Sequence, residues 1–453
     1  HSHEMNATTT FSFDNSPASI KEYIEKAWSG EWREIMPPPP KHSPTLVQFP
    51  LEGSEEKQFA FLPAFGNISV FTTTEGLVLV DTGSQLRAKL AYNLIRSWSP
   101  KPVHTIIYTH GHIDHVFGVD LFDQEAQQKG WPRPRVVAHK NILKRFERYK
   151  LTKGYNASIN QRQFNEKNLD WPVHFREPDL VYDKDELILT VGGIEFQLYH
   201  AKGETDDATW VYVPLYKVVC PGDFFIWASP NCGNPQKVQR YPREWAQALR
   251  HMQKLQPTVL LPGHGAPITS EARVSQALSD TAEFLESISE QTLKLMNEGK
   301  PLHEILEAVQ VPSHLLNKPY LSASYDHPQF IIRNLWRLYG GWWDRRYSSL
   351  LPGNLKDVST EIVSLSGGVK NVVARVKSLL EEYTTQLRTK KEDNHKLLAT
   401  ASHLIDFAYD VAPKDPQVIE ARIAVYDARM KRETSLMARN IFREAVLVTK
   451  AAL

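Results

Sequence analysis

The chain has 453 residues, of which 42% are hydrophobic and 23% are charged, and its 53 basic and 52 acidic side chains leave a formal net charge of +1. This is the composition of a globular protein, which excludes a disordered or fibrous chain. The balanced charge argues against bulk electrostatic binding to nucleic acid or to anionic lipid, so no nucleic-acid partner is expected.

Residues 1–58 are expected to form an N-terminal arm and linker, with one helix from Ile20 to Trp28 and a stiff, extended connector at Pro37–Pro40. The first residues, HSHEMNATTTFSF, lack the basic and apolar regions of a secretory signal, so we expect a cytoplasmic protein. No apolar run is long enough to cross a bilayer, which predicts the absence of a membrane span. The only two cysteines, Cys220 and Cys232, exclude a disulfide framework and a four-thiolate zinc cluster.

Residues 59–315 are expected to form an α/β domain. Short apolar strands broken by Gly and Asn turns start at Phe59, and a helix is predicted over 85–98. Further strand signals cover 104–110, 186–200, 209–220 and 258–265, and helix periodicity covers 270–298. Because strands and helices intermix up to about Ile268, the pattern indicates layered α/β packing.

Residues 316–453 are expected to be helical. Amphipathic helices are predicted over 371–388, 394–412, 416–429 and 433–449. Their apolar stripes are typical of a packed core or a subunit interface rather than of a ligand site.

The strongest chemical signal is the run Thr109-His110-Gly111-His112-Ile113-Asp114-His115, which follows a predicted buried strand. Burying these imidazoles and the carboxylate without partners would cost several kcal/mol, so a divalent cation is the expected partner. Mixed nitrogen and oxygen ligands suit zinc, and iron and manganese also accept them. The H-x-H alternation followed by D-H suits two adjacent ions, and the alternative is a chance cluster of core histidines.

H-x-H-x-D-H resembles the signature of the metallo-β-lactamase superfamily, and three further motifs, one before it and two after it, complete that family's order. Asp81-Thr82-Gly83 resembles the D-T-G that supports the ligands from behind, and Gly222-Asp223 resembles the G-D that supplies a metal-bridging carboxylate. Pro262-Gly263-His264-Gly265 resembles the P-G-H-G that supplies the last histidine. The resemblance implies an αββα sandwich for residues 59–315 and two zinc ions per chain.

Gly203-Glu204-Thr205 stands where most of the superfamily has G-H-T. A glutamate here is similar to the alkylsulfatase-type branch, as are the spacing to Asp223 and the segment WVYVP between them. The resemblance then implies one ion held by His110, His112 and Glu204, a second ion held by Asp114, His115 and His264, and Asp223 shared by both. In the alternative, Glu204 is a solvated loop acid and His200 is the ligand; otherwise His200, like Asp81, is expected behind the ligands.

Two C-terminal segments resemble the alkylsulfatase dimerisation domain. They are YDHPQFIIRNLWRLYGGWWD, from Tyr325 to Asp344, and the segment from His403 to Ala445. The resemblance implies that residues 316–453 form an all-α dimerisation domain and that the chain is a homodimer through it.

The substrate pocket matches that branch less completely. Asn231 and Arg240 stand at matching positions, but the arginine of the branch's L-R-G sequence is absent. Because three carboxylates nearly neutralise two zinc ions, an anionic ester needs further cations, and the nearest in sequence are Lys237, Arg240 and Arg243. Alternatively, these three form the exposed basic edge of a helix that begins near Arg243.

The substrate is expected to be a small molecule with an apolar tail. Residues 145–170 are a candidate insertion over it, and aromatic residues are candidates to line a tunnel for the tail, although ordinary core packing also accounts for them: Phe224, Phe225, Trp227, Trp342 and Trp343.

Together these features predict a dizinc hydrolase that cleaves an alkyl sulfate ester with a metal-bridging hydroxide, with Asp114 and Asp223 as catalytic residues. Water on zinc has a pKa lowered to about 7, so no Ser or Cys nucleophile is needed. The missing L-R-G arginine favours the alternative of a carboxylic ester, lactone or thioester hydrolase on the same site. A third hypothesis is that the metal site is degenerate and the chain is a dimeric scaffold. All seven ligand positions hold residues that can bind a metal ion, which argues against this hypothesis.

Overall fold

The computed structural model describes residues 17–31, 46–49, 58–63 and 65–453, so the Pro37–Pro40 run lies outside the described residues. These residues form two compact units. The first contains the described residues up to Ile159 together with Asn168–Lys300 and Glu304–Gly341, and the second contains Asn160–Lys167, Pro301–His303 and Trp342–Leu453. A domain boundary between residues 315 and 316 stays a prediction.

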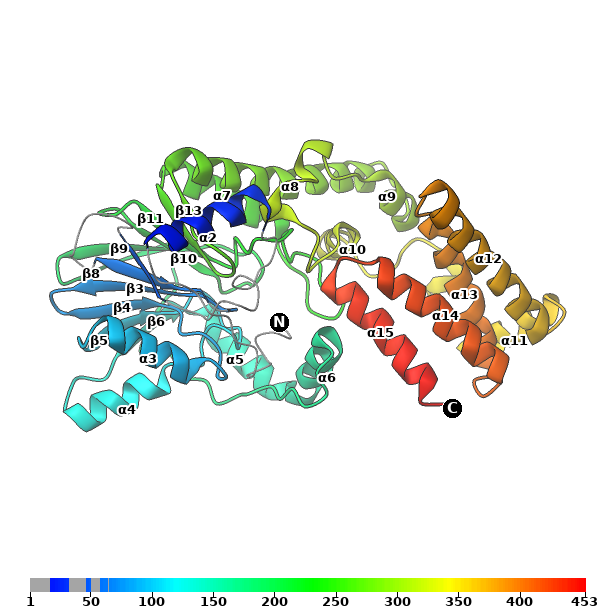
Figure 1. Ribbon diagram of the computed structural model, residues 1–453, viewed down its shortest axis with the longest axis horizontal. Coiled ribbons are helices and arrows are strands. Elements are labelled where there is room, and N and C mark those ends of the chain that lie inside the picture. Colours follow the sequence, from blue (N-terminus) through cyan, green and yellow to red (C-terminus); the bar gives the residue numbers. More distant parts are fainter. Residues whose placement is uncertain (1–16, 32–45, 50–57, 64) are drawn as a thin grey trace. The chain divides into compact units, whose positions relative to one another are not determined.

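The first sheet has seven strands in the order β1 to β7 (Figure 1). Neighbours from β1 to β4 pair antiparallel, and neighbours from β4 to β7 pair parallel. The strands are β1 (Val47–Phe49), β2 (Phe59–Leu62), β3 (Ile68–Thr73), β4 (Gly76–Val80), β5 (Val103–Ile107), β6 (Arg135–His139) and β7 (Leu180–Tyr182).

The second sheet has six strands in the order β13-β12-β11-β10-β9-β8. Its pairs are antiparallel except for β11 and β12, which run parallel. The strands are β8 (Glu186–Val191), β9 (Ile194–His200), β10 (Thr209–Val213), β11 (Val218–Gly222), β12 (Val259–Pro262) and β13 (Ile268–Thr269).

The two sheets pack face to face around one apolar core. Phe71 and Ile107 enter this core from the first sheet, and Phe196 and Val211 enter it from the second. Successive strand residues point to opposite faces, so Ile106 lies instead in a second core, where helices cover the outer face of the first sheet. Those helices are α3 (Ala88–Trp98), α4 (Asp120–Lys129) and α5 (Asn141–Leu151).

Helices also cover the other side of the sandwich. There α8 (Glu271–Asn297) packs against β12, β13 and α7 (Pro242–Lys254). The layers therefore follow the order helix, sheet, sheet, helix, which confirms the predicted αββα fold class. The remaining helices of this part are α2 (Pro17–Ser29), α6 (Lys153–Phe164), α9 (Leu302–Ala308) and α10 (Pro328–Tyr339), of which α6 and α9 contain residues of both units.

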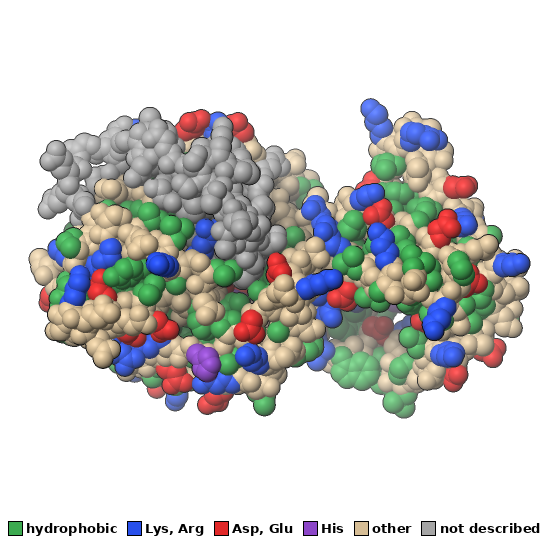
Figure 2. Space-filling model, turned by 60° about the horizontal axis from the view of Figure 1, so that its bottom comes forward, with side chains coloured by type: hydrophobic (Ala, Val, Ile, Leu, Met, Phe, Trp, Pro, Cys, Tyr) green, Lys and Arg blue, Asp and Glu red, His purple; other side chains and the backbone are tan. Residues whose placement is uncertain are grey.

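The C-terminal part is helical, as predicted. An apolar core that includes Val376, Ile405 and Val425 joins its helices. They are α11 (Leu355–Leu365), α12 (Val369–Lys390), α13 (His395–Val411), α14 (Pro416–Arg432) and α15 (Leu436–Lys450). No helix within the described ranges combines the length and the apolar character that a membrane crossing needs. On the face shown in Figure 2, basic and acidic side chains are interspersed rather than gathered by sign.

Candidate metal centre

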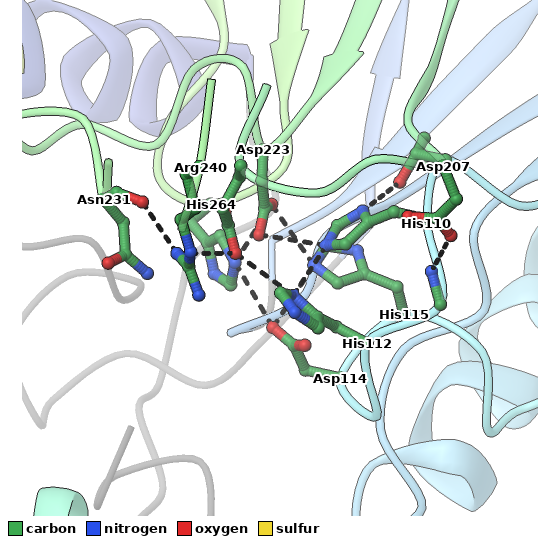
Figure 3. Close-up of polar contacts among 12 residues, drawn as sticks. His110, His112, Asp114, His115, Asp207, Asp223, Asn231, Arg240 and His264 are labelled. Atoms are coloured by element: carbon green, nitrogen blue, oxygen red, sulfur yellow. Dashed lines mark hydrogen bonds and ion pairs between the residues drawn. The ribbon is translucent and has the colours of Figure 1, made fainter. Parts of the chain in front are cut away.

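Side chains with metal-binding chemistry come together where several strands end (Figure 3). The segment from His110 to His115 follows β5, and Glu204 lies in the connection between β9 and β10. Asp223 follows β11 directly, and His264 follows β12 after one glycine. Because β11 and β12 are adjacent and parallel, their carboxyl ends place Asp223 and His264 side by side.

The first group consists of His110, His112, Glu204 and Asp223, whose candidate ligand atoms all lie within 4.8 Å of one another. Nε2 of His110 is 3.3 Å from Oδ2 of Asp223. Nδ1 of His112 is 3.1 Å from Oε1 of Glu204. The group therefore offers two imidazole nitrogens and two carboxylate oxygens to one point.

The second group consists of Asp114, His115, Asp223 and His264, again with ligand atoms within 4.8 Å of one another. Nε2 of His115 is 3.2 Å from both Oδ2 of Asp114 and Oδ1 of Asp223. Nε2 of His264 is 3.3 Å from Oδ2 of Asp114 and 3.2 Å from Oδ1 of Asp223. Asp223 belongs to both groups, with one oxygen facing each.

The electrostatics of the centre fit divalent cations. Among the described residues, Nε2 of His115, Oε2 of Glu204 and Oδ1 of Asp223 are buried without a hydrogen-bond partner. Burial and the neighbouring Asp223 raise the pKa of Glu204 to about 7. Burial opposes the charged imidazolium of His264, but Asp223 and Asp114 raise its pKa to about 10. Without a metal ion, protonated histidines balance the negative charge of the carboxylates, and bound cations would take over that role. Imidazoles and carboxylates are also ligands that zinc accepts.

Asp81 holds the second group from behind. It follows β4, and its backbone φ of 64° is in the left-handed region. Its Oδ1 accepts a hydrogen bond of 2.7 Å from the Thr109 N–H, and its Oδ2 lies 2.8 Å from Nδ1 of His115. A carboxylate on Nδ1 leaves Nε2 as the nitrogen that points toward the centre.

Two contacts support the His264 loop in ways that the sequence does not show, although Gly263 itself belongs to the motif Pro262-Gly263-His264-Gly265. The side-chain amide of Asn67 donates to the backbone oxygens of Pro262 at 3.0 Å and Gly265 at 2.9 Å, although 195 and more residues separate them in the chain. Gly263 lies so close to Asp223 that a Cβ atom on it would stand 2.2 Å from Oδ1. Only the long-range contacts in the fold show that Asn67 holds this loop and that the residue at 263 must leave room for Asp223.

The candidate substrate residues divide in two. Arg240 is buried, with its guanidinium 3.4 Å from Oε1 of Glu204, and it donates to the backbone oxygen of Asn231 at 2.7 Å. Lys237 lines a cavity together with His112 and Glu204. Arg243 does not reach the centre, because it is exposed in the first turn of α7 and lines a separate cavity with Glu286 and Glu298.

The cavity beside the first group has a volume of about 130 Å³. Residues of α5, of the start of α6 and between the two helices form a wall of it, so the part of the predicted insertion from residue 145 to 159 lies beside the centre. The wall residues are Arg145, Arg148, Tyr149, Thr152, Tyr155, Asn156 and Ile159, and the lining also contains Trp171, whose ring centroid lies 5.2 Å from that of Tyr149. The sequence did not single out Arg145, Arg148 or these aromatic residues, since nothing in a helical stripe tells which face covers a site.

Other candidates lie outside both ligand groups. His200 stacks on His139 with ring centroids 3.5 Å apart, and its Nδ1 lies 2.8 Å from the backbone oxygen of Ala208. The structure therefore brings Glu204, and not His200, to the cluster. Phe224, Phe225 and Trp227 are buried in the protein core and do not line the cavity.

Comparison with known proteins gives two family matches. Residues 62–264 match the metallo-beta-lactamase superfamily, and residues 301–450 match the alkyl sulfatase dimerisation family. The chain is 26% identical over 322 residues to a linear primary-alkylsulfatase of Pseudomonas sp. (strain ATCC 19151), a match that covers 66% of this chain and 60% of that protein. It is also 26% identical over 381 residues to an (R)-specific secondary-alkylsulfatase of Pseudomonas sp., covering 78% of this chain and 56% of that protein. The chain thus spans less than two thirds of the length of these relatives.

The fold is similar to that of a solved structure, the stereoselective inverting sec-alkylsulfatase Pisa1 from Pseudomonas sp.. The TM-score is 0.76 at 19% identity, with 99% of this chain and 74% of that one covered. At this identity the likeness establishes the fold alone. The family matches therefore place residues 62–264 in the metallo-beta-lactamase superfamily and residues 301–450 in the alkyl sulfatase dimerisation family.

Proposed function

We propose that the chain is a hydrolase that binds two zinc ions and cleaves an alkyl sulfate ester. His110, His112 and Glu204 would hold one ion, and a second set of Asp114, His115 and His264 would hold the other, with Asp223 shared. Bound zinc would supply a water whose pKa is lowered to about 7 and a Lewis acid that polarises the ester oxygen.

The positive charge of the cavity beside the first group carries this proposal. Its lining contains three arginines, Arg145, Arg148 and Arg240, one lysine, Lys237, whose pKa is lowered by burial to about 7, and one acid, Glu204. Two of the cations have acidic partners, since Arg145 pairs with Asp206 and Asp207, and Arg240 pairs with Glu204. A lining in which basic side chains outnumber acidic ones suits an ester that is itself an anion, whereas a neutral carboxylic ester or lactone needs no such lining.

The chain's own residues have separable tasks in this proposal. Lys237 and Arg148 bind the sulfate group, and Arg240 orients Glu204 and the backbone at Asn231. Asp223, which belongs to both groups, and Asp114, which faces His115 and His264 in the second group, are the catalytic carboxylates. Tyr149 and Trp171 give the apolar part of the substrate a surface to pack on, since both line the cavity.

The names of the relatives and of the dimerisation family support the same class of substrate and a homodimer formed through the C-terminal helices. A cytoplasmic location stays a prediction from the sequence.

The test is a comparison of substrates on one zinc-loaded preparation. Dodecyl sulfate is offered with released sulfate counted, beside a panel of carboxylic esters, lactones and thioesters. Sulfate release with kcat/KM well above that for every panel member supports the proposal. Turnover of the panel alone replaces the sulfatase proposal with the ester hydrolase, and zinc content below one ion per chain with no turnover replaces both with a scaffold.

A further inference from the structure

One buried acid outside the ligand groups connects three parts of the metal centre. Asp207 is buried and lies in the same β9–β10 connection as Glu204. Its Oδ2 accepts a hydrogen bond of 2.9 Å from the backbone N–H of Gly111 (Figure 3). Gly111 is the residue between His110 and His112, so this bond fixes the peptide that carries both imidazoles of the first group.

The other oxygen of Asp207 faces a buried cation. Its Oδ1 is 3.2 Å from Nε of Arg145, which lies on α5. The Arg145 guanidinium also donates to the Tyr149 hydroxyl at 2.7 Å and to Oδ1 of Asp206 at 3.0 Å. Tyr149 and Asp206 thus hold the guanidinium by hydrogen bonds, and Asp207 faces it as a buried ion pair without a hydrogen bond.

The same arginine packs against the metal-binding loop. A Cβ atom at Gly111 would lie 3.2 Å from Cδ of Arg145 and 3.0 Å from the ring of Phe146. Arg145 also lines the cavity in which His112 and Glu204 are exposed. The helix that forms the cavity wall and the loop that carries the histidines are therefore fastened together through one ion pair.

The second group has a different support. Its backing acid is Asp81, which contacts Thr109 and His115. Among the described residues, Asp207 has its hydrogen bond with Gly111 and its ion pair with Arg145, and it forms neither with His115, Asp114 or His264. Asp207 thus contacts only the loop of the first group, whereas Asp81 contacts His115 directly and reaches His110 through the Thr109 hydroxyl, whose oxygen lies 3.0 Å from Nδ1 of His110.

From this arrangement we infer that Asp207 and Arg145 are positioning residues for one metal position only, the one formed by His110, His112 and Glu204. The inference rests on the proposed two-zinc centre. Loss of this ion pair loosens the loop at Gly111 and lowers the zinc affinity of the first metal position. The position formed by Asp114, His115 and His264 keeps its zinc affinity. Acids that orient metal ligands from behind typically change metal affinity by about 10–100-fold when removed.

The experiment measures zinc affinity by competition with a chelator, in two backgrounds that each retain one position. His264→Ala retains the first position and His112→Ala retains the second. Asp207→Asn is placed in each. We expect zinc binding to weaken by about 10–100-fold in the His264→Ala background and by less than about three-fold in the His112→Ala background. Arg145→Lys keeps the positive charge but loses Nε, so it should also weaken zinc binding at the first position.

Asp206→Asn is the matched control, because Asp206 also contacts Arg145 but has no contact with Gly111. It should leave both affinities within about three-fold of their starting values. Equal weakening in both backgrounds, or none in either, overturns the inference while the two-zinc proposal stands. Wild-type protein that binds no zinc rejects the proposed function, and this inference with it. If Asp207→Asn does not fold, as judged by circular dichroism, the Arg145→Lys pair of measurements decides alone.

Discussion

The guanidinium of Arg240 and the carboxylate of Glu204 form a buried ion pair, with Nη1 3.4 Å from Oε1. Arg240 is itself fixed, because its backbone N–H donates to Oδ1 of Asn334 at 2.7 Å and its carbonyl accepts from Nδ2 of the same residue at 2.9 Å. Burial raises the pKa of Glu204 to about 7, and Arg240 works against that rise. Arg240 thus favours the ionised form of a candidate metal ligand.

Replacing Arg240 by methionine should lower kcat/KM for dodecyl sulfate by about 10²-fold and weaken zinc binding, because Glu204 loses the charge that favours its ionised form. Steady-state kinetics and zinc analysis measure both effects. Arg243→Met is the matched control, since Arg243 is exposed on α7 and should change neither quantity. An unchanged kcat/KM in Arg240→Met would contradict the assignment.

Substitution at positions 204 and 200 separates the two candidate ligands. Glu204→Gln keeps the shape of the side chain but removes its charge, so zinc content should fall toward one ion per chain and turnover should fall by about 10³-fold or more. His200→Gln should leave zinc content at the wild-type value, because His200 lies against His139 and Ala208 rather than in a ligand group. The reverse pattern in metal analysis would make His200 the ligand.

Zinc binding should release protons at pH 7. Burial disfavours the charged form of His264 and His115, but nearby carboxylates raise the pKa of His264 to about 10 and that of His115 well above its usual value. Since both imidazoles carry a proton at pH 7 and must lose it to bind zinc, affinity should rise as the pH rises toward 10. Calorimetry in buffers of different ionisation enthalpy should count more than one proton released per chain. A binding enthalpy that is the same in every buffer would rule this out.

The free energy of unfolding should depend on pH through the titration of Asp326. Its carboxylate is fully buried, accepts from the backbone N–H groups of Gly233 at 3.1 Å and His327 at 2.8 Å, and has a pKa raised by burial to about 7. A raised pKa means that the native state binds the proton more tightly, so this group makes the native state less stable as pH rises from about 4 to about 7.

Asp326→Asn removes that titration, although it leaves one N–H facing an amide nitrogen. The free energy of unfolding of Asp326→Asn relative to wild type should therefore increase between pH 5 and pH 8, by at most about 3 kcal/mol. Urea titrations at the two pH values measure the difference. Asp357→Asn, at an exposed position in the first turn of α11, serves as the control and should show no such trend.

Much of the fold could be predicted from the sequence because its elements are local. The alternation of apolar residues identified β5 and β8 to β12, and helix periodicity identified α8 and α12 to α15 within a few residues of their observed ends. The motif residues from His110 to His264 were also accessible, because a ligand must be a particular residue type at the end of a strand. Their ligand roles stay proposals until metal is measured.

The parts that could not be predicted depend on direction and on distant contacts. Arg243 comes only three residues after Arg240 in the sequence. However, α7 starts at Pro242, between the two arginines, and the side chain of Arg243 is exposed on this helix. Three residues contact the centre through partners that are distant in the sequence: Asn67, Arg145 and Asp207. The residues next to them in the sequence therefore give no indication of these contacts. Phe224 and Trp227 resembled tunnel residues by composition, but the ordinary apolar core accounts for them.

The close approach of Gly263 to Asp223 has a consequence for how this protein tolerates change. A methyl group at residue 263 would stand 2.2 Å from the shared carboxylate, and the backbone there has no positive φ, so crowding alone forbids alanine. In a saturation library, residue 263 should accept nothing but glycine for metal loading, whereas Gly130, with open space around it, should lose only the modest preference of a left-handed turn. Variation at this protein's centre is thus limited by volume at a residue that holds no ligand atom.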